Sequence, residues 1–150
     1  VHVGETRRML DAAVAGSGGK VGILGVTVLT SVSTEDLKSA GYRQDFYSDM
    51  RLTVMQRAAM AHAAGCAGVI CSGLEVRRVK DKMGQNFLAV TPGIRPAWTV
   101  TAAEDQRRIT TPAEAVSAGA DYVVIGRPIR DAKDPVQAAA RIATEIEGAM

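Results

Sequence analysis

Short apolar runs alternate with longer amphipathic stretches along the whole chain. The apolar runs are unbroken Val, Ile and Leu segments rather than alternating apolar and polar positions, which is typical of parallel strands buried on both faces. They predict strands at Val1–Val3, Val21–Leu29, Ala67–Cys71, Phe87–Thr91 and Tyr122–Ile125. The stretches that follow them predict helices at Glu5–Ala15, Asp45–Ala64, Leu74–Met83, Pro112–Ala118 and Pro135–Ile146.

Local start and stop signals support several helix boundaries. Thr111 stands before Pro112, with Glu114 at the spacing of a capping box, and Asp134–Pro135 repeats the arrangement of a cap followed by proline. A helix commonly ends at a glycine, because glycine adopts the left-handed conformation without strain. Three predicted helices are followed by such a residue, at Gly65, Gly84 and Gly119.

The order of five strands, each followed by a helix, predicts one α/β domain over residues 1–150. Repeated units of this kind form either a closed parallel barrel or a doubly wound sheet. Five units are slightly more than half of a (β/α)8 barrel, which typically needs about 250 residues. The chain begins at Val1 inside a predicted strand, which suggests that an N-terminal part precedes it.

Composition narrows the function classes. The 47% hydrophobic and 23% charged residues are those of an ordinary soluble globular protein. A net charge of +2 and 4% aromatic residues give little support to nucleic acid or an anionic membrane as partner. No apolar run reaches the length of about 18 residues that a membrane-spanning helix needs. Two cysteines do not make a disulfide framework, so we expect a reducing, cytoplasmic location.

Polar residues follow the predicted strands where each one ends. Thr30 follows the second strand, Ser72 the third, the segment Thr91–Pro96 (TPGIRP) the fourth, and Gly126–Arg127 the fifth. Ligands of parallel α/β proteins bind at these carboxyl ends. Hydroxyls, arginines and glycine backbone suit a phosphorylated small molecule, because a guanidinium can chelate a phosphate and glycine allows close approach. Within TPGIRP, Arg95 is either a ligand contact or a solvated loop residue.

Five sequence motifs in order resemble orotidine 5'-phosphate decarboxylase. They are VTVLTS at 26–31, GVICS at 68–72, VTPGIRP at 90–96, DQRR at 105–108 and GADYVVIGRPI at 119–129. The likeness extends from Val1 to Ile146. It implies a (β/α)8 TIM barrel, of which this chain would be the C-terminal part from the end of strand 4 to helix 8.

The resemblance also implies an activity and its setting. Family members convert orotidine 5'-phosphate to UMP and carbon dioxide in pyrimidine biosynthesis, use neither cofactor nor metal, and usually form homodimers. The ring carbanion left by decarboxylation is stabilised by a Lys-Asp network and protonated by a lysine, while remote phosphate contacts supply binding energy.

Seven substrate-binding residues are implied at the matching positions. On the side of the base, Ser72 would hydrogen-bond the pyrimidine edge, Pro92 would pack near the base, and Thr30 would line the site. Arg95 would belong to the ligand-binding loop, which we expect to continue from Pro96 to Thr110 as a lid.

On the side of the phosphate, Gln106 would contact the ligand from this lid. Gly126 would hold the phosphate through its backbone and Arg127 through its guanidinium.

The sequence departs from the family at the catalytic segment. The family's Asp-x-Lys-x-x-Asp segment would precede Val1, and no copy of it occurs in this sequence. Asp36–Gly41 and Asp131–Val136 match only its first Asp and Lys, so we expect surface charges there and no catalytic residue in this chain. Either the protein is longer than this sequence, or the chain is a non-catalytic half-barrel that binds nucleotide phosphate and needs a partner chain. A related barrel enzyme acting on a sugar phosphate is a third hypothesis.

Two further patterns favour structural roles. His62 and Cys66 share a helix end, but no second pair, such as His2 with Cys71, completes a metal site. Gly16–Lys20 (GSGGK) resembles a phosphate loop, yet Val21 replaces the required hydroxyl residue and a strand follows, so we expect a turn.

Overall fold

The computed structural model describes residues 1–4, 6–99 and 108–150, and four of its strands form a single parallel sheet. The strands are β1 (Leu24–Val26), β2 (Gly68–Ile70), β3 (Leu88–Thr91) and β4 (Tyr122–Val123). They lie side by side in the order in which they follow one another along the chain. Val26, Ile70 and Val90 stand at one level of the sheet. Strands that neighbour in sequence order, with helical connections between them, are the building units of a (β/α)8 barrel.

The predicted first strand is present as a short pairing at the edge of β1. His2 forms an isolated parallel bridge with Val26. The Val3 amide donates to the Val26 carbonyl at 2.8 Å, and the Val26 amide donates to the Val1 carbonyl at 2.7 Å. Residues 1–3 therefore occupy the place of a fifth strand, although the pairing is too short to count as a regular ladder.

All four strands are shorter than the apolar runs that predicted them, and the difference is largest for β1 and β4. β1 covers only the centre of Val21–Leu29, and both ends of that run are exposed, Val21 to 64% and Leu29 to 49%. β4 covers only the first half of Tyr122–Ile125, although the Val124 amide still donates to the Thr91 carbonyl at 2.8 Å. An apolar run indicates where a strand lies, whereas its ends depend on where neighbouring strands stop pairing.

Helices fill the connections. They are α1 (Arg7–Ser17), α2 (Thr34–Ser39), α3 (Gln44–Tyr47), α4 (Met50–Ala63), α5 (Gly73–Met83), α6 (Pro112–Ser117), α7 (Arg127–Arg130), α8 (Pro135–Glu147) and a 3-10 turn η1 (Ala97–Thr99). The predicted capping signals are confirmed. The Thr111 side chain accepts from the Glu114 amide in a full capping box, and the Asp134 side chain accepts from the Gln137 amide at 3.0 Å.

The single helix predicted at Asp45–Ala64 is wrong. The structure divides this stretch into α3 and α4, because the chain is extended at Asp49 and the Asp49 carboxylate caps the new helix by accepting from the Arg51 amide. An aspartate favours such a cap because its side chain satisfies an amide that has no partner within the helix. The apolar positions continue across the break, which is why periodicity alone predicted one helix.

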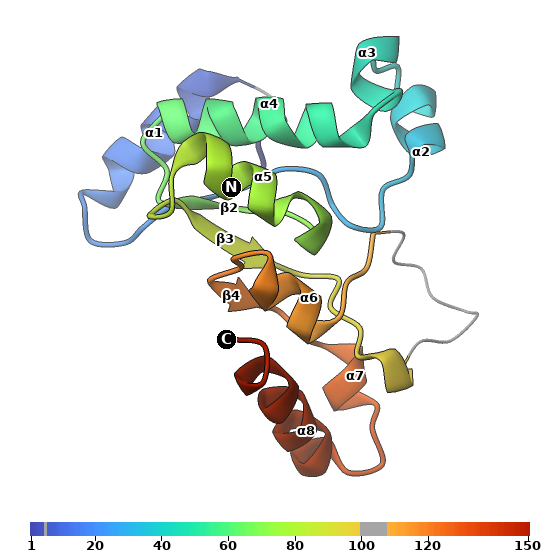
Figure 1. Ribbon diagram of the computed structural model, residues 1–150. Coiled ribbons are helices and arrows are strands. Elements are labelled where there is room, and N and C mark those ends of the chain that lie inside the picture. The colour runs from blue at the N-terminus through green and yellow to red at the C-terminus, as the bar shows by residue number, and fades with distance from the viewer. Residues whose placement is uncertain (5, 100–107) are drawn as a thin grey trace.

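The helices cover one face of the sheet in a row. Figure 1 shows α4 above the strands, α5 in front of them, and α6 and α8 at the other end. Contacts join neighbours in the order α1, α4, α5, α6 and α8. The hydrophobic core lies between this row and the sheet, where Val69, Ala89, Val54, Val76 and Val79 are fully buried. Gly25 keeps α4 close, because a Cβ atom there would lie 2.9 Å from the Ala61 methyl group.

The opposite face of the sheet is only partly covered, and here the expectation of strands buried on both faces is wrong for the described residues. Val26, Ile70 and Val90 are half-buried, and Val124 is 52% exposed. Side chains on this inner face of a barrel are covered by the strands across the axis, which four strands cannot supply. The inner face instead forms one wall of the cavity described next.

Candidate functional site

A cavity of about 580 Å³ lies at the carboxyl ends of the strands. Its apolar wall comes from the inner face of the sheet, and its rim comes from the loops after β1, β3 and β4. The lining residues are Val26, Val28, Leu29, Thr30, Ser31, Ile70, Pro92, Gly93, Arg95, Val124, Gly126, Arg127 and Arg130. The site therefore combines an apolar wall with a polar, cationic rim, as in many small-molecule sites.

Five of the seven substrate-binding residues implied by the sequence line this one cavity. They are Thr30, Pro92, Arg95, Gly126 and Arg127. They belong to three different loops, so only the parallel alignment of the strand ends brings them together. Of the other two, Ser72 is buried behind the wall, and Gln106 lies outside the described residues. The predicted lid is described only at its ends, because its middle, at 100–107, also lies outside them.

Arg95 is not a solvated loop residue. Only 6% of it is exposed, and its guanidinium donates to the Ile94 carbonyl at 2.8 Å. Its own amide donates to the Thr110 carbonyl at 2.9 Å, next to a parallel bridge between Ile94 and Thr110. The charge is therefore fixed in the cavity wall by a short strand-like pairing.

The turn after β4 places two further arginines. The backbone at Gly126 leaves open space where a Cβ atom would stand, and α7 begins directly after it. Arg127 is half-buried in the rim. Arg130, which sequence reasoning missed as a lining residue, is exposed and forms a bidentate ion pair with Asp131, at 2.6 and 2.9 Å. The Arg130 guanidinium lowers the pKa of the Asp131 carboxyl.

The charge of the cavity favours an anion. Three arginines and no carboxylate stand among its lining residues in the described part of the chain. Guanidinium groups match the oxygens of a phosphate geometrically. The low exposure of Arg95 strengthens its attraction for an anion. This arrangement suits a ligand with a phosphate at one end and an apolar or aromatic body against Val26 and Ile70.

Ser72 lies at the end of β2 and caps α5. Its hydroxyl donates to the Arg108 carbonyl at 3.2 Å and accepts from the Leu74 amide at 3.3 Å. The side chain is fully buried and does not line the cavity. Its contact with a pyrimidine edge stays a prediction. Beside these two bonds the hydroxyl has a second acceptor lone pair for such a contact, but the side chain would have to become accessible from the cavity.

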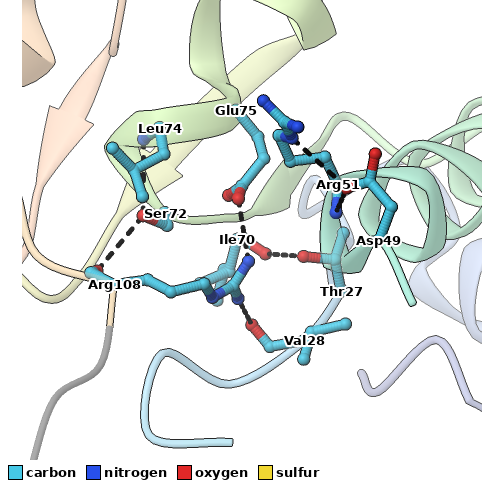
Figure 2. A network of polar contacts seen from close by, with 9 residues as sticks. All are labelled: Thr27, Val28, Asp49, Arg51, Ile70, Ser72, Leu74, Glu75 and Arg108. Atoms are coloured by element: carbon cyan, nitrogen blue, oxygen red, sulfur yellow. Dashed lines mark hydrogen bonds and ion pairs between the residues drawn. The ribbon is translucent and has the colours of Figure 1, made fainter. Parts of the chain in front are cut away.

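A buried ion pair that the sequence did not predict stands behind the cavity wall. Arg108 donates through Nη1 to Glu75 Oε1 at 2.8 Å and through Nη2 to the Val28 carbonyl at 2.8 Å. Figure 2 shows its guanidinium between the helix that carries Glu75 and the loop that carries Val28. Burial raises the pKa of the Glu75 carboxyl, although Arg108 opposes the shift. The spacing of Ser72 and Glu75 is that of a capping box, which would have turned Glu75 toward its own helix end.

Comparison with known proteins identifies the family of the chain. The model of the family described as "Orotidine 5'-phosphate decarboxylase / HUMPS family" matches residues 1–142. The chain belongs to this family.

Curated relatives of the chain carry the name of the same family. The chain is 50% identical over 150 residues to "Orotidine 5'-phosphate decarboxylase" of Desulfosudis oleivorans, covering 100% of this chain and 60% of that protein. It is 49% identical to the protein of the same name from Rhodopseudomonas palustris, covering 93% of this chain and 57% of that protein. The chain therefore spans about three fifths of the length of these relatives.

Solved structures confirm the fold. A crystal structure of orotidine 5'-phosphate decarboxylase from Lactobacillus acidophilus matches 97% of this chain and 61% of its own, with a TM-score of 0.77 and 35% identity. A second, orotidine 5'-monophosphate decarboxylase from Sulfolobus solfataricus, matches with a TM-score of 0.59 at 21% identity, which supports the fold alone. The chain is thus part of a (β/α)8 barrel.

The two incomplete copies of the family's catalytic segment have local structural roles. Asp36 is exposed on α2 and accepts from the Ser33 amide at 2.8 Å, which makes it part of a capping box. Asp131 is held by Arg130.

Within residues 1–4, 6–99 and 108–150, no three His, Cys, Asp or Glu side chains gather in a group that could hold a metal ion. In the same residues, no helix is long and apolar enough to span a membrane.

Proposed function

We propose that the protein carrying this chain decarboxylates orotidine 5'-phosphate to UMP, and that this chain supplies the phosphate-holding side of the site. The observation that carries the proposal is the convergence of Thr30, Pro92, Arg95, Gly126 and Arg127 on one cationic cavity in a member of this family. A nucleoside monophosphate has the two ends that this cavity suits, a phosphate dianion and a flat ring.

Arg127 is the principal phosphate ligand in this proposal. Its guanidinium stands beside Gly126, where no side chain blocks the approach of phosphate oxygens to the backbone. Arg95 adds positive charge to the same rim, whereas Asp131 compensates the charge of Arg130. Such contacts lie far from the reacting ring carbon, so their binding energy can be used to orient the ring and to lower the barrier of the chemical step.

The loss of carbon dioxide itself is assigned to the intact protein. The Lys-Asp segment that the resemblance implies does not occur in the printed sequence, and the chain spans about three fifths of its relatives' length. We also propose that the protein is a homodimer and lies in the cytoplasm, and both proposals rest on the family to which the chain belongs. Sedimentation of the purified protein would test the first, and fractionation of cells the second.

Calorimetry of nucleotide binding tests the role of Arg127. Arg127→Ala should weaken UMP binding by about 1.5–3 kcal/mol, the usual range for a hydrogen bond to a charged group, and should weaken uridine binding much less. Arg43→Ala is a matched control, because Arg43 is exposed on the surface and forms a local ion pair with Asp45. Equal losses for UMP and uridine would contradict a phosphate contact at Arg127.

A second measurement separates the two hypotheses on catalysis. Release of carbon dioxide from orotidine 5'-phosphate by the intact protein supports the decarboxylase. Binding of UMP without release of carbon dioxide supports the nucleotide-binding half-barrel. The intact mass of the denatured protein, compared with 15.8 kDa, shows whether the chain continues beyond this sequence.

A further inference from the structure

The buried pair of Glu75 and Arg108 holds together two loops that line the cavity, although neither residue lines it. We propose that Glu75 is a positioning residue, which acts through Arg108 to set the loop after β1 against the loop after β3. The expected effect of Glu75 on UMP binding rests on the proposed function. The expected effect of Glu75 on the two loops rests on geometry alone.

Arg108 contacts both cavity loops. Its Nη2 donates to the carbonyl of Val28, which lines the cavity after β1. Its own carbonyl packs against Gly93 of the loop after β3, where an added Cβ atom would lie only 3.0 Å from it. The same Cβ atom would lie 3.2 Å from Cγ2 of Thr30. Arg108, Gly93 and Thr30 are thus close neighbours, with too little room between them for an added methyl group.

Glu75 is the group that fixes this arginine. It projects from the first turn of α5, is 2% exposed, and receives Nη1 of Arg108 at 2.8 Å. Figure 2 shows Arg51 on its other side, held by Asp49. Glu75 Oε2 and Arg108 Nε have no hydrogen-bond partner in the described part of the protein. Loss of one partner would leave the other charge buried and unpaired, which favours movement of Arg108 toward water.

A second ion pair, in which the lysine is buried and the aspartate is partly exposed, offers a control at the opposite end of the strands. Lys80 is 4% exposed and donates to Asp121 at 2.6 Å. It also donates to the carbonyls of Gln85 and Phe87, at 2.9 and 3.0 Å. Both pairs link α5 to another segment, but none of these four residues lines the cavity. Neutralising Asp121 should therefore cost stability without moving the cavity loops.

The experiment compares Glu75→Gln with Asp121→Asn in the intact protein. We expect Glu75→Gln to raise the Kd for UMP by about tenfold, which corresponds to about 1.4 kcal/mol of binding free energy. Asp121→Asn should change the Kd by less than about twofold, even where it lowers the Tm as much as Glu75→Gln does. Hydrogen exchange should rise at amides of residues 28–31 and 93–95 in Glu75→Gln alone.

Each outcome decides the proposal. An unchanged Kd and unchanged exchange in Glu75→Gln would overturn it, and so would equal effects of the two variants on the loops and on the Kd. A lack of UMP binding by the unaltered protein would contradict the proposed function instead. The exchange measurement would then still show whether Glu75 positions the two loops.

Discussion

Gly73, the first residue of α5, packs directly against the side chain of Thr110. A Cβ atom at Gly73 would overlap the Thr110 hydroxyl and would lie 2.9 Å from Cγ2. Both residues are buried. The contact joins the turn after β2 to the short pairing that holds Arg95, so the backbone of one cavity loop depends on the absence of a side chain on a neighbouring helix.

Gly73→Ala should lower the free energy of unfolding by about 1–3 kcal/mol, as is usual when an extra carbon is forced into a packed interior. Gly16→Ala is the control, because Gly16 lies in α1 with nothing within 4 Å of the added Cβ atom. That change should stabilise the protein by up to about 1 kcal/mol through helix propensity. Urea unfolding measures both, and a Gly73→Ala variant as stable as the parent would show that Thr110 moves without cost.

Cys71 should make stability fall at alkaline pH. Burial raises the pKa of its thiol to about 12, from an ordinary value of 9.0. The folded state therefore keeps a proton that the unfolded chain releases above pH 9, and unfolding becomes easier by at most about 1.4 kcal/mol per pH unit from there upward. Unfolding of the parent and of Cys71→Ala should be compared between about pH 8 and about pH 10.5. Parallel curves would contradict the raised pKa.

Glu75 should also make stability fall as pH rises, but in the acid range. Burial raises the pKa of its carboxyl above the ordinary value of 4.5, so the folded state binds a proton more tightly than the unfolded state does. Its contribution to stability is therefore largest below that value and decreases as pH rises through the raised pKa. The difference in unfolding free energy between the parent and Glu75→Gln should decrease with rising pH. A difference that grows with pH would mean that pairing with Arg108 outweighs burial.

Trp98 reports on the contact between η1 and α8. It is the only tryptophan in the sequence, and the Arg141 guanidinium lies 4.5 Å from the centre of its ring. Arg141→Ala should uncover one face of the indole, increase quenching of its fluorescence by acrylamide, and cost about 0.5–1 kcal/mol of stability. Arg141→Lys should retain part of the effect. Arg8→Ala, at an exposed position of α1, should change neither quenching nor stability. Unchanged quenching in Arg141→Ala would show that the ring is covered by other groups.

The sequence predicted those features that depend on neighbouring residues. The caps at Thr111 and Asp134 were predicted because a cap and its amide lie within three residues of each other. The gathering of Thr30, Arg95 and Arg127 followed from a general rule, that parallel strands present their carboxyl ends at one edge. The identity of the ligand came from resemblance to a family and not from these physical rules.

Other features depended on contacts between distant segments. Glu75 and Arg108 are separated by 33 positions, and the local spacing from Ser72 favoured a different partner for Glu75. The break at Asp49 was missed because the apolar pattern continues across it. The ends of β1 were missed because its neighbours, and not its composition, decide where pairing stops.

The bridge between Ile94 and Thr110 has a consequence for how the family can diversify. It holds two positions of the chain side by side, so the main cost of a flexible insertion between them would be the conformational entropy lost on closing a longer connection. This cost grows only with the logarithm of length, by about 0.6 kcal/mol for each doubling. Insertions or deletions between the two ends should therefore be tolerated by the sheet, which leaves the chain free to vary what it presents to a ligand while the barrel wall stays the same.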